Sequence, residues 1–364
     1  MPGEPVALHR RKGPHFLRRE EISRLRKTAM GALLLLSLLS SVCNTDTTPL
    51  AIDVGELPRQ LTTSGRDFAP FWPPDGRWIA FLTSRNTYNP VASAICNELW
   101  IMDLNGRDQR SLVTLAYIGP AGYRTVDAVS WFPDSKCMLI CVYAHDRLQS
   151  SSIWIVTVGG SKIQLTSEND YAQDPACAPD GSKIAFIVQG PNLPRGSPIF
   201  RLYVANPDGS SPVLIETGLI DTYSWKRDSR SLIYSFWDSE DRNWDIWQSS
   251  IDGTSKTRIT QTLVNETYPS WSYDGTQITF SIEDSVFVTP ADDFQPRRAM
   301  TGARTPQWIP VRNLPVVGHW VVDLFGNVIL KISEGPHWGS VSFSLRGDLF
   351  VYSLDGNIWM DRLP

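Results

Sequence analysis

Carboxylate side chains recur shortly before a repeated apolar segment, and they are the residues of this sequence with the clearest potential for binding chemistry. The loops that lead into the repeated segment hold six acids, Asp67, Asp127, Asp170, Asp174, Asp221 and Glu266. We select four of them as binding candidates: Asp67, Asp127, Asp221 and Glu266. Carboxylates gathered in one opening raise one another's pKa or recruit a cation. The selection predicts a site for a basic peptide or for Ca²⁺, which takes about 6–8 oxygen ligands. The alternative is that each acid caps its own loop.

Motifs for catalysis are absent from the sequence. It contains no Gly-x-Ser-x-Gly elbow, no His-Glu-x-x-His, no Walker loop and no Cys-x-x-Cys pair. The repeated part holds His145, His319 and His337, and no further ligand is spaced to join them in a metal site. The acids of the repeated Asp-Gly turns, such as Asp75, are explained by capping of the turn. We therefore name no catalytic residue.

The elements that must position the acids are copies of one segment, residues 66–106. It reads as a strand ending at Trp72, a Pro-Pro-Asp-Gly turn, a strand through Ile79–Phe81 and a third strand over Leu99–Asp103, with the apolar alternation of strands. The residue before the turn recurs as a column of Trp72, Trp131, Cys177, Trp225, Trp271, Trp308 and Phe343. A second column in the third strand is Trp100, Trp154, Tyr203, Trp247, Phe287, Trp320 and Trp359.

Two columns of seven members predict an all-β fold, a single seven-bladed β-propeller of four-stranded antiparallel blades over residues 51–364. The sequence stops after a third strand at Asn357–Arg362, so the last blade lacks an outer strand. Ala51–Thr62 resembles the outer-strand segment Lys162–Thr166. We predict that this N-terminal strand completes the last blade, which removes two free sheet edges and favours a monomer.

Residues 1–43 differ in kind from the repeats. Residues 1–28 carry eight Lys/Arg and three Glu, and Ala29–Val42 is an apolar run of 14 residues. A spanning helix needs about 20 residues, so the run fits a signal peptide better than an anchor. We predict export to the periplasm or cell surface, with residues 44–50 as a polar tether. The residues at 39–43 resemble the lipobox of bacterial lipoproteins, which implies lipidation of Cys43. Ordinary cleavage beside an incidental Cys43 is the alternative.

The charge of the exported part restricts its partners. Without residues 1–42 the chain keeps 26 basic and 35 acidic residues, a net charge of −9. An acidic surface argues against nucleic acid and anionic membrane surfaces as binding partners. We therefore expect contact with a membrane only through an N-terminal lipid or signal anchor. The remaining cysteines indicate buried thiols and no disulfide framework; they are Cys96, Cys137, Cys141 and Cys177.

The repeat resembles that of TolB-type, WD-like propellers. The run from Asp67 to Phe81 carries the pattern Asp-x-x-Pro-x-Trp-x-Pro-Asp-Gly-Arg-x-Ile-Ala-Phe, and its Asp-Gly core recurs at 180–181 and 274–275. Leu-Thr at 61–62 and 165–166 and Ile-Thr at 259–260 match the family's outer-strand ending. The resemblance covers residues 50–364 and implies the fold. TolB itself carries an α/β domain before a six-bladed ring, so this chain is not expected to be TolB.

Three functions are open at this point. The first is a non-catalytic binding or scaffold module that recognises a protein or peptide through the face that carries the long loops. The second is a propeller enzyme, a lyase or glycosidase acting on polysaccharide, which would need acid, base and metal groups around the central channel. The third is a purely structural protein of the bacterial cell envelope.

Overall fold

The computed structural model describes residues 55–85, 88–89, 94–95, 97–114, 123–145, 150–192, 198–301, 305–318, 320–332 and 338–364. The described residues all belong to one compact unit, Thr45–Pro364, which we call the second unit because it follows residues 1–44. The predicted signal peptide, Cys43 and the tether lie outside the described residues. None of the helical segments in the described ranges has the length and apolar character needed to cross a membrane.

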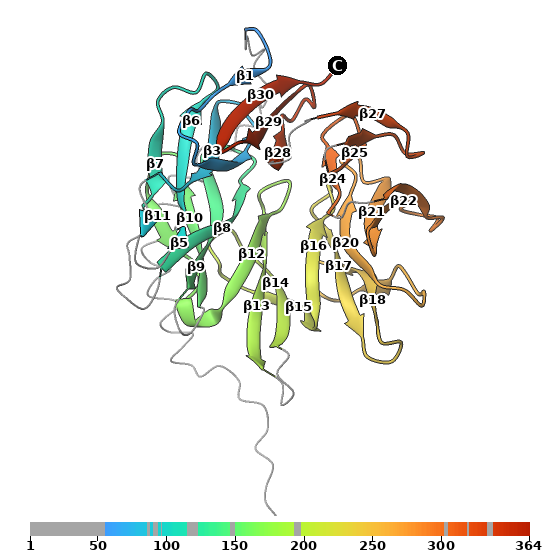
Figure 1. Cartoon of the computed structure of the whole chain (residues 1–364). Helices are drawn as coiled ribbons and strands as arrows, with labels where there is room; N and C mark the ends of the chain where they lie inside the picture. Colours follow the sequence, from blue (N-terminus) through green and yellow to red (C-terminus); the bar gives the residue numbers. More distant parts are fainter. Residues whose placement is uncertain are drawn as a thin grey trace, which may run out of the picture. The chain divides into compact units, whose positions relative to one another are not determined.

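The second unit consists of seven four-stranded antiparallel sheets arranged as the blades of a β-propeller, which confirms the predicted fold (Figure 1). The first strands of the blades are β2 (Asp67–Phe71), β8 (Tyr123–Trp131), β12 (Ala172–Cys177), β16 (Ile220–Trp225), β20 (Glu266–Trp271), β24 (Gln307–Ile309) and β28 (Trp338–Phe343). The second strands are β3 (Trp78–Thr83), β9 (Cys137–His145), β13 (Ile184–Asn192), β17 (Ser231–Asp238), β21 (Gln277–Ile282), β25 (Leu314–Val317) and β29 (Leu349–Leu354).

The third strands are β6 (Glu98–Asp103), β10 (Ser151–Thr157), β14 (Pro198–Ala205), β18 (Asn243–Ser250), β22 (Ser285–Pro290), β26 (Trp320–Val322) and β30 (Asn357–Arg362). The outer strands are β7 (Arg110–Val113), β11 (Lys162–Gln164), β15 (Val213–Gly218), β19 (Lys256–Arg258), β23 (Arg297–Thr301), β27 (Val328–Lys331) and β1 (Arg59–Gln60). A small ladder of β4 (Tyr88–Asn89) and β5 (Ala94–Ile95) and the 3₁₀ turn η2 (Glu168–Asp170) lie outside the blades. First strands of neighbouring blades contact one another at five of the seven blade boundaries, which places these strands on the inner side of the ring.

The N-terminal strand closes the ring, as predicted. β1 pairs with β30 in the register Arg59↔Met360 and Gln60↔Trp359, and the two lie side by side in Figure 1 as the blue and red ends of the chain. The Leu61 amide continues the ladder to the Ile358 carbonyl at 2.8 Å. Thr62 Oγ1 accepts a hydrogen bond from the Ile358 amide at 2.9 Å. The seventh blade is therefore built from both ends of the second unit.

The Asp residues between first and second strands cap their turns, as predicted. In each of the first five blades the Oδ1 atom accepts the amide hydrogen of the residue two positions on, at 2.9–3.0 Å. The residues are Asp75, Asp134, Asp180, Asp228 and Asp274. Capping of this kind satisfies a backbone donor that the hairpin leaves unpaired. These acids have a structural role at the turn.

The aromatic column before the turn joins neighbouring blades. Trp131 Nε1 donates to the Phe71 carbonyl of the preceding blade at 3.1 Å, and Trp308 Nε1 donates to the Ser270 carbonyl at 3.2 Å. Trp225 makes the same contact with blade 3 at 3.3 Å. In these three residues the ring packs between sheets while its Nε1 atom is satisfied. Trp271 of the same column differs, because its buried Nε1 has no hydrogen-bond partner in the described structure.

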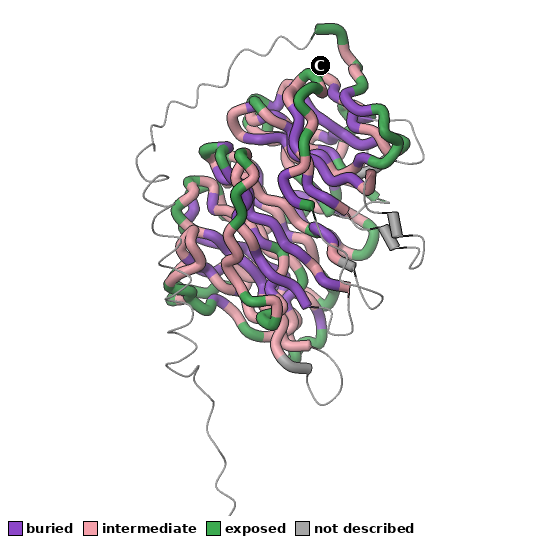
Figure 2. Tube along the Cα trace, turned by 90° about the vertical axis from the view of Figure 1, so that its left-hand side faces the viewer, coloured by how far each residue is buried: buried purple, intermediate pink, exposed green. Residues whose placement is uncertain are grey.

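The hydrophobic core is divided among the interfaces between blades. One cluster joins Leu61 and Ile79 to Ile358, across the boundary where the ring closes. Another joins Leu139 of blade 2 to Ile184 of blade 3. Figure 2 shows buried residues following the strands and exposed residues concentrated in the turns. Because no sheet buries both faces by itself, each blade depends on its neighbours for stability.

Candidate functional site

The candidate acids occupy two different positions at the start of the first strands. Asp67 and Glu266 are the first residues of β2 and β20, five residues before the column Trp, and both are 0% exposed. Asp127 and Asp221 lie four residues before the column Trp in β8 and β16, and both are exposed. Successive strand residues point to opposite sides of a sheet, so the shift by one residue separates an internal pair from an external pair.

The external acids come together with a third carboxylate, Asp174 in β12. We call Asp127, Asp174 and Asp221 the axial acids, since they project from the first strands of blades 2, 3 and 4. Asp174 keeps solvent-exposed surface, yet the surrounding protein displaces much of its water. This desolvation, followed by the charges of Asp221 and Asp127, raises the pKa of Asp174. Desolvation also raises the pKa of Asp221. Three carboxylates of successive blades thus share one region of negative potential.

Asp174 was in the acid series of the sequence but was not among the selected candidates. It lies three residues before the column position, in a stretch where the pairing of β12 with β13 shifts register between Gln173 and Ala176. Its φ of 50° is in the left-handed region, which Asp tolerates better than most residues. The sequence signal for this position is the Asp-Pro pair at 174–175. Ala-Pro in blade 1 and Tyr-Pro in blade 5 occupy the same place, and the residue before each Pro has a positive φ as Asp174 does.

A chain of hydrogen bonds runs from the axial acids to a histidine. Thr125 Oγ1 donates to Asp127 Oδ1 at 2.7 Å and lies 3.0 Å from His145 Nε2. The ring of His145 contacts that of Tyr143 at a centroid distance of 4.7 Å. Carboxylate, hydroxyl and imidazole are groups that can orient a polar ligand or move a proton.

Asp67 is neutralised within its own blade. Arg85 Nε donates to Asp67 Oδ1 at 2.8 Å and Arg85 Nη2 lies 2.5 Å from Asp67 Oδ2, a bidentate ion pair. The guanidinium also lies 5.1 Å from the centre of the Trp100 ring. Burial alone would raise the pKa of Asp67, but hydrogen bonds from Arg85 and nearby hydroxyls outweigh it and lower the pKa. The charge of Asp67 is therefore balanced by Arg85, so this carboxylate is not available to bind a partner or a metal ion.

Glu266 is buried without such a partner. Thr262 Oγ1 donates to Glu266 Oε1 at 2.5 Å, while Glu266 Oε2 is buried and has no hydrogen-bond partner in the described structure. Burial is the main cause that raises the pKa of Glu266, and the charge of Asp245 raises it further. The structure thus brings Asp127 and Asp221 together through Asp174, and holds Asp67 and Glu266 inside the blades.

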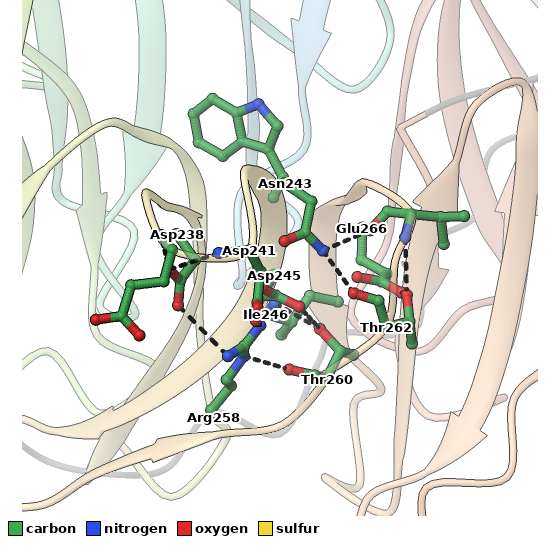
Figure 3. A network of polar contacts seen from close by, with 12 residues as sticks. Asp238, Asp241, Asn243, Asp245, Ile246, Arg258, Thr260, Thr262 and Glu266 are labelled. Carbon is green, nitrogen blue, oxygen red and sulfur yellow. Dashed lines mark hydrogen bonds and ion pairs between the residues drawn. The ribbon is translucent and has the colours of Figure 1, made fainter.

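A second acidic group lies on blade 4, where Asp238, Asp241 and Asp245 place carboxylate oxygens within 4.8 Å of one another (Figure 3). Arg258 reaches all three: Nη2 is 2.6 Å from Asp241 and from Asp245, and Nη1 is 3.4 Å from Asp238. A guanidinium among the carboxylates occupies the place that a metal would take. We interpret this group as an internal ion-pair network.

Known proteins resemble this chain in fold rather than in sequence. No protein-family profile matches the sequence, and no curated protein matches it. Among solved structures, an oligogalacturonate lyase in complex with manganese matches at a TM-score of 0.61 and 13% identity, over 84% of this chain and 92% of that chain. TolB from Acinetobacter baumannii matches at 0.45 and 19%, over 68% and 58%. A protein described as TolB from Agrobacterium tumefaciens matches at 0.46 and 18%, over 68% and 87%.

Likeness at these identities shows the fold alone. The predicted β-propeller of seven four-stranded blades is confirmed by the sheet topology. The chemistry of this chain must be argued from its own residues. Among the acids described above, the axial acids are exposed and form no ion pair with a basic side chain in the described ranges.

Proposed function

We propose that this chain is a non-catalytic, exported binding module that recognises a basic segment of a protein or peptide partner at the axial acids. The observation that carries the proposal is that Asp127, Asp174 and Asp221 lie in the first strands of three successive blades and are exposed. Desolvation, followed by the charges of Asp221 and Asp127, raises the pKa of Asp174. Within the described ranges none of the three forms an ion pair with a basic side chain. A Lys or Arg side chain of a partner would balance the charge of these acids.

The location of the axial acids supports peptide recognition. They lie near the starts of first strands, on the face where the loops between second and third strands also emerge. A rigid ring can present such loops and acids to a partner without rearranging. The net charge of −9 outside residues 1–42 favours a basic partner over nucleic acid. We propose a monomer, since β1 completes the seventh blade and leaves no unfinished sheet for a second copy.

Asp127→Asn combined with Asp221→Asn is expected to weaken binding of a synthetic Lys-rich peptide of about ten residues. Two exposed charge pairs are worth about 0.2–1 kcal/mol each, which corresponds to a loss of about two- to thirtyfold in affinity. Isothermal titration calorimetry at low and at high salt measures the loss, and salt should weaken wild-type binding because the attraction is screened.

The matched control is Asp228→Asn with Asp252→Asn, which removes the same charge from turns at the opposite ends of the strands and keeps the capping oxygen. If the two double variants bind the peptide with equal affinity, the loss is due to the lower net charge of the protein and not to the axial acids. Absence of peptide binding in the wild-type protein would contradict the proposal and favour a structural envelope protein.

An enzyme acting on polysaccharide is the second candidate. Two observations favour it: the fold likeness to the lyase and the hydrogen-bonded series of Asp127, Thr125 and His145 beside carboxylates of raised pKa. An Asp of raised pKa near a hydrogen-bonded hydroxyl and imidazole is a grouping suited to proton transfer. An anionic polysaccharide would need a bound Mn²⁺ or Ca²⁺ to approach these acids. Metal-dependent turnover of an oligogalacturonate would therefore promote this candidate.

Export and lipidation form a separate part of the proposal. The basic residues 1–28 and the apolar run Ala29–Val42 support a signal peptide, and Cys43 follows it directly. Mass spectrometry of the protein purified from a bacterial host is expected to show an N-terminus at Cys43 that carries a diacylglyceryl group. An unmodified N-terminus beyond residue 43 would indicate a secreted protein, and an intact Met1 would contradict export.

A further inference from the structure

Two blades begin with a fully buried carboxylate, and only one of these acids has an arginine beside it. Asp67 pairs with Thr83 in the β2–β3 register, and Arg85 follows two residues later. Glu266 holds the same register position in β20, which puts Asp284 at the place of Arg85. Both carboxylates are 0% exposed. Blade 5 therefore buries an acid where the repeat no longer supplies the arginine.

Two buried oxygen atoms at this place have no hydrogen-bond partner in the described structure: Glu266 Oε2 and Asn243 Oδ1. One short loop links the two side chains. Asn243 Nδ2 donates to the carbonyls of Thr262 at 2.8 Å and Val264 at 3.0 Å, and Thr262 Oγ1 donates to Glu266 Oε1. The donors of Asn243 are thus satisfied by the loop, while its acceptor is left over (Figure 3). Leaving buried polar atoms unpaired is costly, so a missing partner is indicated.

Asp245 adds a second buried carboxylate. It lies two residues after Asn243 in β18, so both side chains are on the same side of that strand. It is 0% exposed, and its charge is felt at Glu266. Its counter-ion Arg258 is shared with two further carboxylates. One guanidinium therefore pairs with three acids, and Glu266 adds a fourth carboxylate beside Asp245 without adding a cation.

We propose that Glu266, Asp245 and Asn243 bind a divalent cation of the calcium type between blade 4 and blade 5. The donors are all oxygen atoms, two from carboxylates and one from an amide, which suits a hard cation; carbonyls and water can complete the shell. The ion would balance the buried charge of Glu266 in blade 5, as Arg85 balances that of Asp67 in blade 1. The site is separate from the axial acids and shares Asp245 with the Arg258 network. It does not depend on the proposed binding function.

Calcium titration of the full-length protein, first treated with chelator, tests the site. Wild type is expected to bind one Ca²⁺ at this site and to gain about 4 °C in Tm when free Ca²⁺ is about 100 times its Kd. Glu266→Gln keeps the size of the side chain and removes its charge, so it is expected to lose both the heat of binding and the gain in Tm. Glu240→Gln changes an exposed acid of blade 4, between β17 and β18; it is the control and should respond as wild type does.

Two further variants keep the test decisive. Asp67→Asn should lower Tm without changing the response to Ca²⁺, because the cation of that acid is Arg85. The double variant at Asp127 and Asp221 should also keep this Ca²⁺ site. If Glu266→Gln does not fold, Glu266→Asp is used, and its affinity for Ca²⁺ should fall at least tenfold. A wild-type protein that shows no response to Ca²⁺, or a Glu266→Gln variant that keeps it, would overturn the proposal in favour of a protonated Glu266.

Discussion

Removal of residues 1–62 is expected to abolish the cooperative unfolding transition, whereas removal of residues 1–54 should leave it nearly unchanged. The longer deletion takes away β1, Leu61 and Thr62, which form the outer strand of the seventh blade. Leu61 is 6% exposed and packs with Ile79 and Ile358 across the closure. The shorter deletion removes none of these interactions.

The size of this effect follows from the packing and hydrogen bonds that the longer deletion removes. Truncation of a buried Leu costs about 2–5 kcal/mol, and each ladder hydrogen bond contributes about 1 kcal/mol. Together they exceed about 5 kcal/mol, a large part of the 5–15 kcal/mol that stabilises a typical domain. The deletion also exposes the edge of β30, which favours aggregation. Circular dichroism during thermal and urea unfolding measures the loss of stability.

A cooperative transition of normal midpoint in the longer deletion would contradict closure by β1. Leu61→Ala offers a milder version of the same test, with an expected loss of about 2–5 kcal/mol. Gly106→Ala provides an independent check from the neighbouring blade. A Cβ there would lie 2.3 Å from the Leu61 carbonyl oxygen, at a φ of +76°, so it should disturb the same closure.

The blade count could be predicted from the sequence because the column residues serve the interfaces that every blade must form. Blade 6 shows how far this holds. Its turn at 309–312 has lost the Asp-Gly pair, yet Trp308 keeps its bond to blade 5 and Ile309 is fully buried. β24 and β25 are short, and the turn between them places Val311 and Asn313 at positive φ. Blade 6 therefore keeps the residues that pack against its neighbours although its turn residues differ from those of the other blades.

The position of the candidate acids in the loops that lead into the repeated segment does not indicate which side of the sheet each side chain is on. Counting from the column Trp instead separates Asp67 and Glu266 at five residues from Asp127 and Asp221 at four. Strand alternation then assigns the pairs to opposite sides. Asp174 lies three residues before the column position, within the register shift that the first strands of blades 1 to 5 share, so strand alternation alone does not give its direction. The partners of the acids are set by tertiary contacts, and no local pattern in the sequence indicates them.

Arg85→Ala is expected to lower the free energy of unfolding by about 3–5 kcal/mol, because it leaves the fully buried Asp67 carboxylate without its counter-ion. The substitution also removes the contact of the guanidinium with Trp100 and its 2.7 Å bond to Gln109. Arg77→Ala is the matched control. That side chain is 66% exposed and lies 3.7 Å from Asp75, so its loss should cost less than about 1 kcal/mol.

The pH dependence distinguishes this ion pair from mere packing by Arg85. The pKa of Asp67 is lowered in the folded protein, so its stabilisation is present above the unfolded value of about 3.9 and is lost as pH falls through the lowered folded pKa. In Arg85→Ala the effect of burial prevails and should raise that pKa, which reverses the sign. The variant then gains relative stability as pH is lowered from 7 towards 4, and the gap to wild type narrows. If the difference in stability between the two proteins is constant over this range, the loss is due to packing. A loss due to the charge of Asp67 must change with pH, because the folded-state pKa of Asp67 is lowered in wild type and raised in the variant.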